Sequence, residues 1–306
     1  MSIFKIYNLS MKKQKNKFQH NILDQSIWDD FEFRDDDIII NSYQKSGTTW
    51  VQQIIAQLIW NGDVDINLSE VSPWIDCNFP SKEERIAIVK NQTHRRFLKS
   101  HLPFDLIKFS DKVKYIHIAR DGRDVVWSLY NHHAKFKKEA LNDINRVNKP
   151  KSPILKQAPD TPLEYFRDWL RLDGYPWWSF WDHILSWWNN RNSVNIMLIH
   201  FNELKADLPY NIKKIASFLN INIENLTWDK IIKHCTFDYM KKNSMKYAPF
   251  SGKPWKGGAK AFFKKGTNER WKNVLTDEDI YNYEKTAYSK LGSDCAKWLI
   301  TGNIYC

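Results

Sequence analysis

The chain has 306 residues, 42% of them hydrophobic, which is enough for one large α/β domain or two small ones with a substantial core. Its formal charge of +11 suits a polyanionic ligand; nucleic acid also fits this charge, but zinc-finger spacing, an aromatic RNA-binding signature and repeats are all missing. No stretch approaches the ~20 apolar residues of a membrane helix, and no apolar leader opens the chain. The four cysteines are scattered. We therefore expect a cytoplasmic protein with reduced thiols that binds neither a membrane nor nucleic acid.

The predicted elements alternate along the chain. Residues 1–35 have the composition of an irregular arm at the edge of a single domain that spans residues 36–300. Within that domain, apolar runs predict strands over 37–42, 96–99, 113–119 and 194–199. Apolar residues at helical spacing predict helices over 48–60, 81–91, 162–170, 177–190, 208–219 and 277–291, and a helix is expected to follow residues 120–124 and to continue through about Ala134.

Three segments lack clear periodicity. Residues 61–80 are interrupted by prolines and are expected to form a loop, and residues 136–160, rich in Lys, Asn and Pro, are expected to form a mobile loop. Residues 243–270 are rich in Gly, Lys, Pro and aromatic residues and are expected to form a long ordered loop or lid. The tryptophans between Trp169 and Trp188 are expected mainly to pack helices together.

This alternation predicts an α/β fold with a central parallel sheet flanked by helices on both faces. Ligands on such sheets bind at the carboxyl ends of the strands. The segments 43–50, 99–103 and 120–128 all follow predicted strands. We therefore expect the functional residues to lie in these three segments.

The first segment, from Tyr43 to Trp50, reads YQKSGTTW and has the form of a strand, a tight loop and a helix start. Free backbone N–H groups and the helix dipole make such a junction an anion site. Its Lys precedes the only Gly, unlike the common nucleotide loop, in which the Lys follows the last Gly. The predicted anion-binding residues are Lys45, Ser46, Gly47, Thr48 and Thr49.

The second segment offers a base. Lys99 and His101 lie two residues apart, so in extended backbone they share a side. A histidine at this position is suited to general base catalysis because its pKa lies near neutrality. We find no cluster with metal-ligand spacing, and no metal is expected.

The third segment and a late basic run offer a second anion site. Arg120 follows a strand directly and Ser128 lies eight residues on, near one side of the following helix. Lys264, Lys265 and Gly266 add two cations and a flexible turn. Two separated anion sites with a Trp for stacking suggest a nucleotide phosphorylated at both ends.

At this point the sequence resembles the cytosolic-type sulfotransferases, which use 3'-phosphoadenosine 5'-phosphosulfate (PAPS) and release adenosine 3',5'-bisphosphate (PAP). The family's Y-P-K-S-G-T-T-W reads YQKSGTTW, K-x-H-L-P reads KSHLP at residues 99–103, and the 3'-phosphate motif reads ARDGRDVVWS at residues 119–128. The loop R-K-G-x-x-G-x-W-K reads KKGTNERWK at residues 264–272. The resemblance covers residues 28–300 and implies the family's P-loop-like, PAPS-binding fold, with its bacterial members the more similar.

The resemblance implies roles for these positions. His101 is the implied base for a hydroxyl or amine acceptor, Lys45 and Lys99 stabilise the transferred group and leaving nucleotide, and Ser128 holds the 3'-phosphate and restrains Lys45. Further nucleotide contacts are implied for Trp50, Arg120, Phe201, Cys235, Thr236, Phe237, Lys264, Lys265 and Gly266. Acceptor contacts are expected from Trp74, Asp76, Phe79, His101 and Trp177.

Several positions depart from the family pattern. Gln44 replaces a Pro, Lys264 an Arg and Glu269 a Gly, and each change bears on PAPS affinity. Phe201 and Cys235 stand where Tyr and Thr are usual. The dimer motif K-x-x-x-T-V-x-x-x-E lacks its Val and Glu after Thr276, which leaves monomer or homodimer open.

Alternative functions remain open on the sequence alone. A P-loop-type kinase or NTPase would require Mg²⁺ and ATP, and an inactive nucleotide-binding relative would bind PAP without transfer. The acceptor is a small molecule of undecided class; a bacterial secondary metabolite is favoured, and a saxitoxin-type alkaloid is one case, for which Asp76 or Asp173 would meet a positive charge. The sequence does not distinguish O- from N-sulfation.

Overall fold

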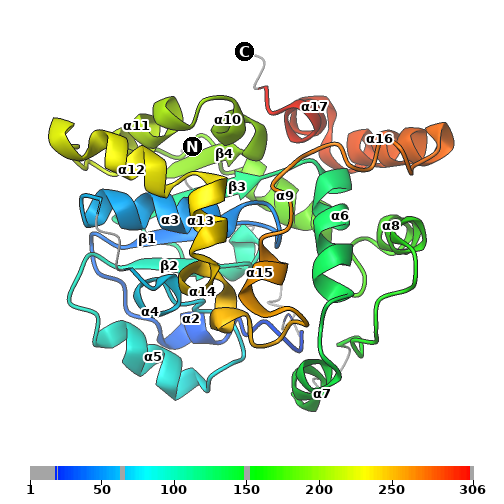
Figure 1. Ribbon diagram of the computed structural model, residues 1–306, viewed down its shortest axis with the longest axis horizontal. Helices are drawn as coiled ribbons and strands as arrows, with labels where there is room; N and C mark the ends of the chain where they lie inside the picture. Colours follow the sequence, from blue (N-terminus) through cyan, green and yellow to red (C-terminus); the bar gives the residue numbers. More distant parts are fainter. Residues whose placement is uncertain (1–17, 19, 63–65, 148–151, 304–306) are drawn as a thin grey trace, which may run out of the picture.

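The computed structural model describes residues 18, 20–62, 66–147 and 152–303, and a four-stranded parallel sheet forms its centre (Figure 1). The strand order is β2-β1-β3-β4, with every pair parallel. The strands are β1 (Ile38–Asn41), β2 (Phe97–Ser100), β3 (Lys114–Ala119) and β4 (Ile196–His200). The predicted α/β class and parallel sheet are therefore confirmed.

Alternation of side chains along the strands explains why both faces of the sheet are covered. In β1, Ile39 packs into one hydrophobic cluster, whereas Ile38 and Ile40 pack into the other. The same alternation holds in β3, where Tyr115 and Ile116 point to opposite clusters. Each face therefore needs its own layer of helices.

One layer contributes apolar residues to the cluster around Ile38. It consists of α3 (Thr48–Ile59), α4 (Leu68–Val71), α10 (Phe201–Ala206), α11 (Leu208–Phe218), α12 (Trp228–His234), α13 (Phe237–Lys242), α14 (Ser244–Tyr247) and α15 (Gly258–Phe262). The other layer packs around Ile39 and consists of α2 (Ile27–Asp30), α5 (Lys82–Lys90), α6 (Gly122–His133), α7 (Lys138–Arg146), α8 (Pro162–Arg171), α9 (Phe180–Trp188), α16 (Asp277–Leu291) and α17 (Ser293–Thr301). Short 3₁₀ turns occur at η1 (Phe104–Leu106), η2 (Asn225–Thr227) and η3 (Pro249–Gly252).

Aromatic side chains fill the second layer. Trp169, Trp181 and Trp187 are fully buried there, and Trp169 and Trp181 contact Phe180. The expectation that this tryptophan-rich stretch packs helices together is confirmed for these three residues. No helix among the described residues is long and apolar enough to cross a membrane.

The structure differs from the predicted elements in several places, among them the helices α2, α10, α12 and α13, which were not predicted. The expected mobile loop over 136–160 contains helix α7, and the expected loop over 61–80 contains α4. The segment 243–270 is built from short helices rather than one long loop, and a further helix, α17, follows α16. Residues 63–65 and 148–151 of the two expected loops lie outside the described residues.

The described part of the predicted N-terminal arm is packed onto the domain. Ile27 and Trp28 in α2 are buried, and Ile22 accepts a backbone hydrogen bond from Asn78 at 2.7 Å. Residues 1–17 and 19 lie outside the described residues. Residues 20–33 therefore belong to the wall of the molecule beside the segment 72–79.

The sheet has a topological switch point between β1 and β3. From β1 the chain runs outward to β2 and then returns across β1 to β3 and onward to β4. The connections that leave β1 and β3 therefore diverge, which opens a crevice at the carboxyl ends of these strands. The segments after both strands lie at this crevice, as the sequence predicted.

Candidate active site

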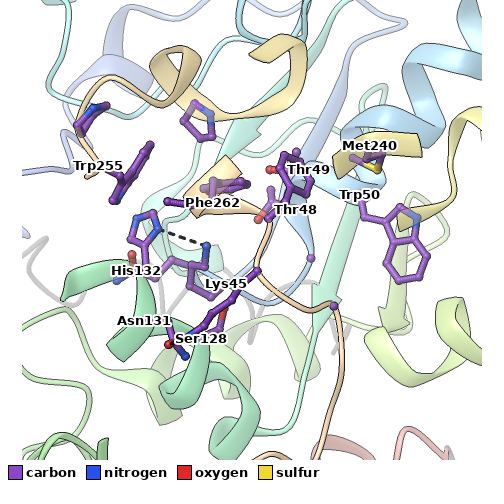
Figure 2. A pocket seen from close by; sticks show the side chains of 18 of the residues that line it. Lys45, Thr48, Thr49, Trp50, Ser128, Asn131, His132, Met240, Trp255 and Phe262 are labelled. Carbon is purple, nitrogen blue, oxygen red and sulfur yellow. Dashed lines mark hydrogen bonds between the residues drawn. The ribbon is translucent and has the colours of Figure 1, made fainter. Parts of the chain in front are cut away.

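A cavity of about 750 Å³ opens at the carboxyl ends of the strands. It is lined by the loop after β1, the start of α3, the segment after β2, the inner side of α6 and the segment 249–270. Figure 2 shows Lys45, Ser128 and His132 facing one part of this space, with Trp50 and Met240 on another side. The cavity therefore joins the three segments expected to carry function.

The loop after β1 places the start of α3 at the cavity. Gly47 has a φ of 120° and precedes Thr48, the first residue of α3. No side chain caps this helix, and the Trp50 N–H donates to the Gly47 carbonyl at 2.9 Å, which leaves the N–H groups of Thr48 and Thr49 without a partner among the described residues. Thr48 and Thr49 line the cavity, while the Ser46 hydroxyl is buried and has no hydrogen-bond partner among the described residues. This donor set fits an anion such as a phosphate.

Lys45 extends its ammonium group into the cavity. Its Nζ lies 3.4 Å from His132 Nδ1 and 4.0 Å from the centre of the Phe262 ring (Figure 2). Burial, followed by the positive charges of Lys99 and Arg120, lowers the pKa of Lys45 to about 7. The amine is therefore only partly protonated near neutral pH, and its charge is sensitive to its neighbours.

Arg120 forms a second cationic centre at the end of β3. Its guanidinium donates to the Asn268 Oδ1 atom at 2.6 and 3.1 Å and stacks 4.2 Å from the Phe201 ring centre. Burial lowers the pKa of Arg120 to about 10, which leaves it protonated. By contrast, Arg123 pairs with Asp121 at 2.6 Å, so local ion pairing involves Arg123 rather than Arg120.

Aromatic residues form another wall of the cavity. Trp50 and Phe201 meet edge to face at 5.3 Å, and both line the cavity together with Thr236 and Phe237. The Trp50 indole N–H donates to the Cys235 carbonyl at 2.7 Å. Cys235 therefore contributes its backbone to this wall, while its side chain is fully buried.

The basic loop after α15 covers the Arg120 side of the cavity. Lys264, Lys265 and Gly266 line it, and the Lys264 Nζ atom hydrogen-bonds to Asn131 Oδ1 on α6. Gly266 packs so closely that a Cβ there would lie 2.6 Å from the Phe237 ring. Glu269 turns away: its carboxylate pairs with Lys272 at 2.9 Å and does not line the cavity.

His101 has a defined tautomer. Its Nδ1 lies 2.6 Å from the Ser42 carbonyl oxygen, which can only accept, so Nδ1 carries the proton. Burial, followed by the positive charge of Lys99, lowers the pKa of His101 well below its usual value. The ring is therefore neutral and its Nε2 is unprotonated, which is the form of a base.

Two charged residues lie near His101: the charge of Lys99 lowers the pKa of this histidine, and Asp76 accepts a hydrogen bond from its backbone N–H. The Lys99 ammonium lies 4.3 Å from the Trp74 ring centre, and burial lowers its pKa to about 8. Asp76 is fully buried and accepts hydrogen bonds from Trp74 Nε1 at 2.6 Å, Ser100 Oγ at 2.5 Å and the His101 N–H at 3.3 Å. Burial raises the pKa of Asp76 to about 6.

The rest of the cavity is mainly apolar. Beyond His101 its lining residues are Ile22, Trp74, Cys77, Phe79, Phe136, Ala140, Ile144, Trp177 and Trp255. Among the described residues, Asp143 is the one carboxylate in the lining, and it pairs with Arg146 at 3.0 Å. This side therefore offers an apolar space with little negative charge.

The structure brings most of the predicted site residues together. All of them line the cavity except Ser46, Asp76 and Cys235. The expectation that Asp76 or Asp173 meets a charged acceptor needs correction. Asp76 is buried and already accepts the three hydrogen bonds described above. Asp173 accepts hydrogen bonds from the Ser179 hydroxyl at 2.6 Å and the Phe180 N–H at 3.1 Å at the start of α9. Burial and local hydrogen bonding explain both differences.

Other lining residues were not identified from the sequence. Asn131 and His132 lie three and four residues after Ser128, so helical spacing alone would have placed them on one face. No such pattern marks Phe262, which reaches the cavity only through tertiary packing. No group of three or more His, Cys, Asp or Glu side chains suited to a metal occurs within the described residues.

Comparison with known proteins places this site in a family. The sulfotransferase domain matches residues 35–294. A mouse protein named sulfotransferase 1B1 is 31% identical over 86% of this chain and 85% of its own length, and a glycolipid sulfotransferase of Mycobacterium bovis is 27% identical over 91% and 92%. The crystal structure of mouse sulfotransferase SULT7A1 complexed with PAP is similar with a TM-score of 0.70 and 26% identity, covering 90% of this chain and 91% of that one. The chain therefore belongs to the sulfotransferase family and is a PAPS-dependent sulfotransferase.

Proposed function

We propose that this sulfotransferase moves the sulfuryl group from PAPS to the hydroxyl or amine of a small-molecule acceptor, with His101 as general base. The observation that carries the proposal is the tautomer of His101, because its Nδ1–H is held by the Ser42 carbonyl at 2.6 Å. The base nitrogen, Nε2, then belongs to a residue that lines the same cavity as Lys45 and Lys99.

The proposed transfer is a direct displacement. The acceptor oxygen or nitrogen gives its proton to His101 Nε2 as it forms the new bond to sulfur. The bond from sulfur to the 5'-phosphate oxygen breaks, and PAP leaves with that electron pair. Apolar walls around His101 keep water from competing with the acceptor.

The cations of the site have separate tasks in this proposal. Lys45 stabilises the negative charge that develops on the leaving nucleotide, and Lys99 stabilises the sulfuryl oxygens. The N–H groups of Thr48 and Thr49 supply fixed dipoles at the start of α3. None of these groups needs to move far, because all line one cavity.

PAPS supplies the sulfuryl group, and the residues present fit its two phosphate ends. The uncapped start of α3 and the unpaired Ser46 hydroxyl suit the 5' end, while Arg120, Ser128, Lys264, Lys265 and Gly266 suit the 3'-phosphate. Trp50 and Phe201 offer ring surfaces for the base, beside Thr236, Phe237 and the backbone of Cys235.

We propose an uncharged acceptor with a flat or cyclic apolar skeleton. Lys45, Lys99, Lys253 and Arg270 contribute positive charge to the lining, against the single carboxylate found among the described residues. A saxitoxin-type alkaloid carries guanidinium cations, so this balance favours a neutral secondary metabolite over it. Similarity to mycobacterial glycolipid sulfotransferases makes a glycolipid a second acceptor to test.

The remaining proposals concern the protein as a whole. We propose that residues 36–300 form the sulfotransferase domain, with residues 1–35 as an arm at its edge, and that the enzyme works in the cytoplasm. Monomer and homodimer are both compatible with the altered motif after Lys272.

Two measurements test the proposed function. In a thermal-shift titration, PAP should raise the melting temperature, whereas ATP with Mg²⁺ and AMP should have much smaller effects. A response to ATP with Mg²⁺ instead would favour a kinase or NTPase. Substituting His101→Gln should abolish sulfuryl transfer in an acceptor screen and leave PAP binding intact; turnover retained in this variant would contradict the base assignment.

A further inference from the structure

Lys45 makes its closest polar side-chain contact with a residue outside the recognised motifs. Its Nζ lies 3.4 Å from Nδ1 of His132 on α6, as the dashed line in Figure 2 shows. The sequence predicted that Ser128 would restrain Lys45, yet no hydrogen bond joins these two side chains within the described residues. His132 follows Ser128 by one helical turn and faces the same cavity.

The surroundings of His132 leave it little else to bind. Its ring packs among Phe136, Trp255 and Phe262, with ring centres 4.5–5.8 Å away. Burial, followed by the positive charge of Lys45, lowers the pKa of His132 well below its usual value. The imidazole is therefore neutral. Since an ammonium group only donates, Nδ1 must accept and the ring proton lies on Nε2.

The groups that face Lys45 from neighbouring elements are mostly positive or neutral. They are Lys99 from β2, His101 after β2, Arg120 after β3 and His132 from α6. In the part of the chain that the structure describes, no carboxylate pairs with Lys45. A neutral acceptor is therefore the one polar partner that favours the protonated form of this lysine.

We propose that the neutral imidazole of His132 is a positioning residue for transfer: it accepts a hydrogen bond from Lys45, which holds this cation at the α6 wall of the cavity and keeps it charged. The inference rests on the proposed role of Lys45. A lysine that loses its proton can no longer stabilise charge on the leaving nucleotide, so His132 acts on the reaction through Lys45 and not by contact with the acceptor.

The contact can be tested on the free, full-length protein without any sulfuryl transfer. Competitive trace labelling with acetic anhydride between pH 5.5 and 9.5, read by mass spectrometry of the Lys45 peptide, reports when this amine loses its proton. The wild-type midpoint is expected near pH 7. His132→Phe keeps a flat ring but removes the acceptor, and the midpoint should fall by about one pH unit.

A matched variant separates the hydrogen bond from packing. His132→Asn places an amide oxygen near the position of Nδ1, and its midpoint should stay close to that of the wild type. A His132→Phe midpoint equal to wild type, or an equal shift in both variants, would overturn the proposal. If His132→Phe does not fold, His132→Gln, whose oxygen lies farther along the side chain, takes its place with the same expected shift.

Kinetics then separate this inference from the proposed function. The alkaline limb of kcat/KM for PAPS should move to lower pH in His132→Phe and not in His132→Asn. A shifted labelling midpoint in a protein without sulfotransferase activity would support the contact and contradict the proposed function. An unshifted midpoint in an active enzyme would contradict the contact and support the proposed function.

Discussion

Gly47 is the residue on which the shape of the nucleotide loop depends. Its φ of 120° is rarely adopted by other residues, and a Cβ would lie 2.8 Å from Ile118 Cδ1 and 3.0 Å from Phe201 Cδ2. We expect Gly47→Ala to lower the free energy of unfolding by about 1–3 kcal/mol and to weaken PAP binding, because the loop must shift. Urea unfolding and calorimetric titration measure the two effects.

A second glycine provides the control for Gly47. Gly258 also has a positive φ, 61°, but a Cβ there would meet no atom within 4 Å. Gly258→Ala therefore adds backbone strain without the steric contact, and it should leave PAP affinity unchanged. Equal losses of PAP affinity in both variants would show that the contacts with Ile118 and Phe201 are unimportant.

Glu269 tests a departure from the family pattern. It adopts a φ of 64° where the family motif has Gly, and its carboxylate pairs with the exposed Lys272. Glu269→Gly should raise the free energy of unfolding by about 0.5–1 kcal/mol, since the left-handed conformation is strained for Glu. Glu269→Ala, which loses the ion pair but keeps the strain, should give no gain, and both variants should bind PAP like the wild type. Weaker stability in Glu269→Gly would contradict this account.

The sequence predicted which residues lie at the site better than it predicted the burial and hydrogen bonding of each side chain. The motif residues of three segments line one cavity because the carboxyl ends of parallel strands meet at one edge. Asp76, Asp173 and Cys235 do not have the contacts that the sequence predicted. A sequence does not reveal that a carboxylate is already hydrogen-bonded by its neighbours, or that a cysteine side chain is fully buried. The bond from Trp50 to the Cys235 carbonyl is likewise a backbone contact that no side-chain pattern encodes.

At the scale of elements, the sequence located the four strands because each is a short apolar run that is buried on both faces. Helix α7 was missed for the opposite reason. Its residues are mostly exposed and polar, and Leu141 is its one buried residue. Its apolar residues, Ala140, Leu141 and Ile144, do share one face, but the helix is short and lies in a segment rich in Lys, Asn and Pro, which favoured the loop interpretation.

Helix α7 nevertheless lines the part of the cavity that we propose for the acceptor. Ala140 and Ile144 lie on its inner side and line the cavity. Ile144→Trp should reduce the space for the acceptor and raise the KM for bulky acceptors by about tenfold, while PAP affinity stays unchanged. The readout is acceptor KM beside PAP affinity by titration.

The same helix offers a matched control. Asn142 is exposed and does not line the cavity, so Asn142→Trp should change neither the acceptor KM nor PAP affinity. If Ile144→Trp behaves like Asn142→Trp with every acceptor that turns over, α7 does not border the acceptor site.

At the scale of the whole molecule, the buried core contains unusual titratable groups. His117, His133, His183 and His200 are almost fully buried. Burial is the largest cause that lowers their pKa values, to about 4 for His133 and His200, about 3 for His183 and well below the usual value for His117. Burial acts in the opposite direction on two acids, raising the pKa values of Asp76 and Asp124 to about 6.

These shifts predict acid sensitivity. Below about pH 6.5 the unfolded chain protonates these four histidines together with His101 and His132, whose pKa values burial also lowers, whereas the native state keeps all six neutral. The free energy of unfolding therefore decreases by about 1.4 kcal/mol per unit fall in pH for each histidine. The two acids offset part of this loss, because the native state protonates them first. The free energy of unfolding should therefore fall by about 5 kcal/mol between pH 6 and pH 5. Urea unfolding at both pH values measures the difference, and His183→Leu should reduce it by about 1.4 kcal/mol, since the variant lacks one of the six histidines. A stability that is constant or rises over this interval would mean that the buried histidines are charged, or that the acids outweigh them.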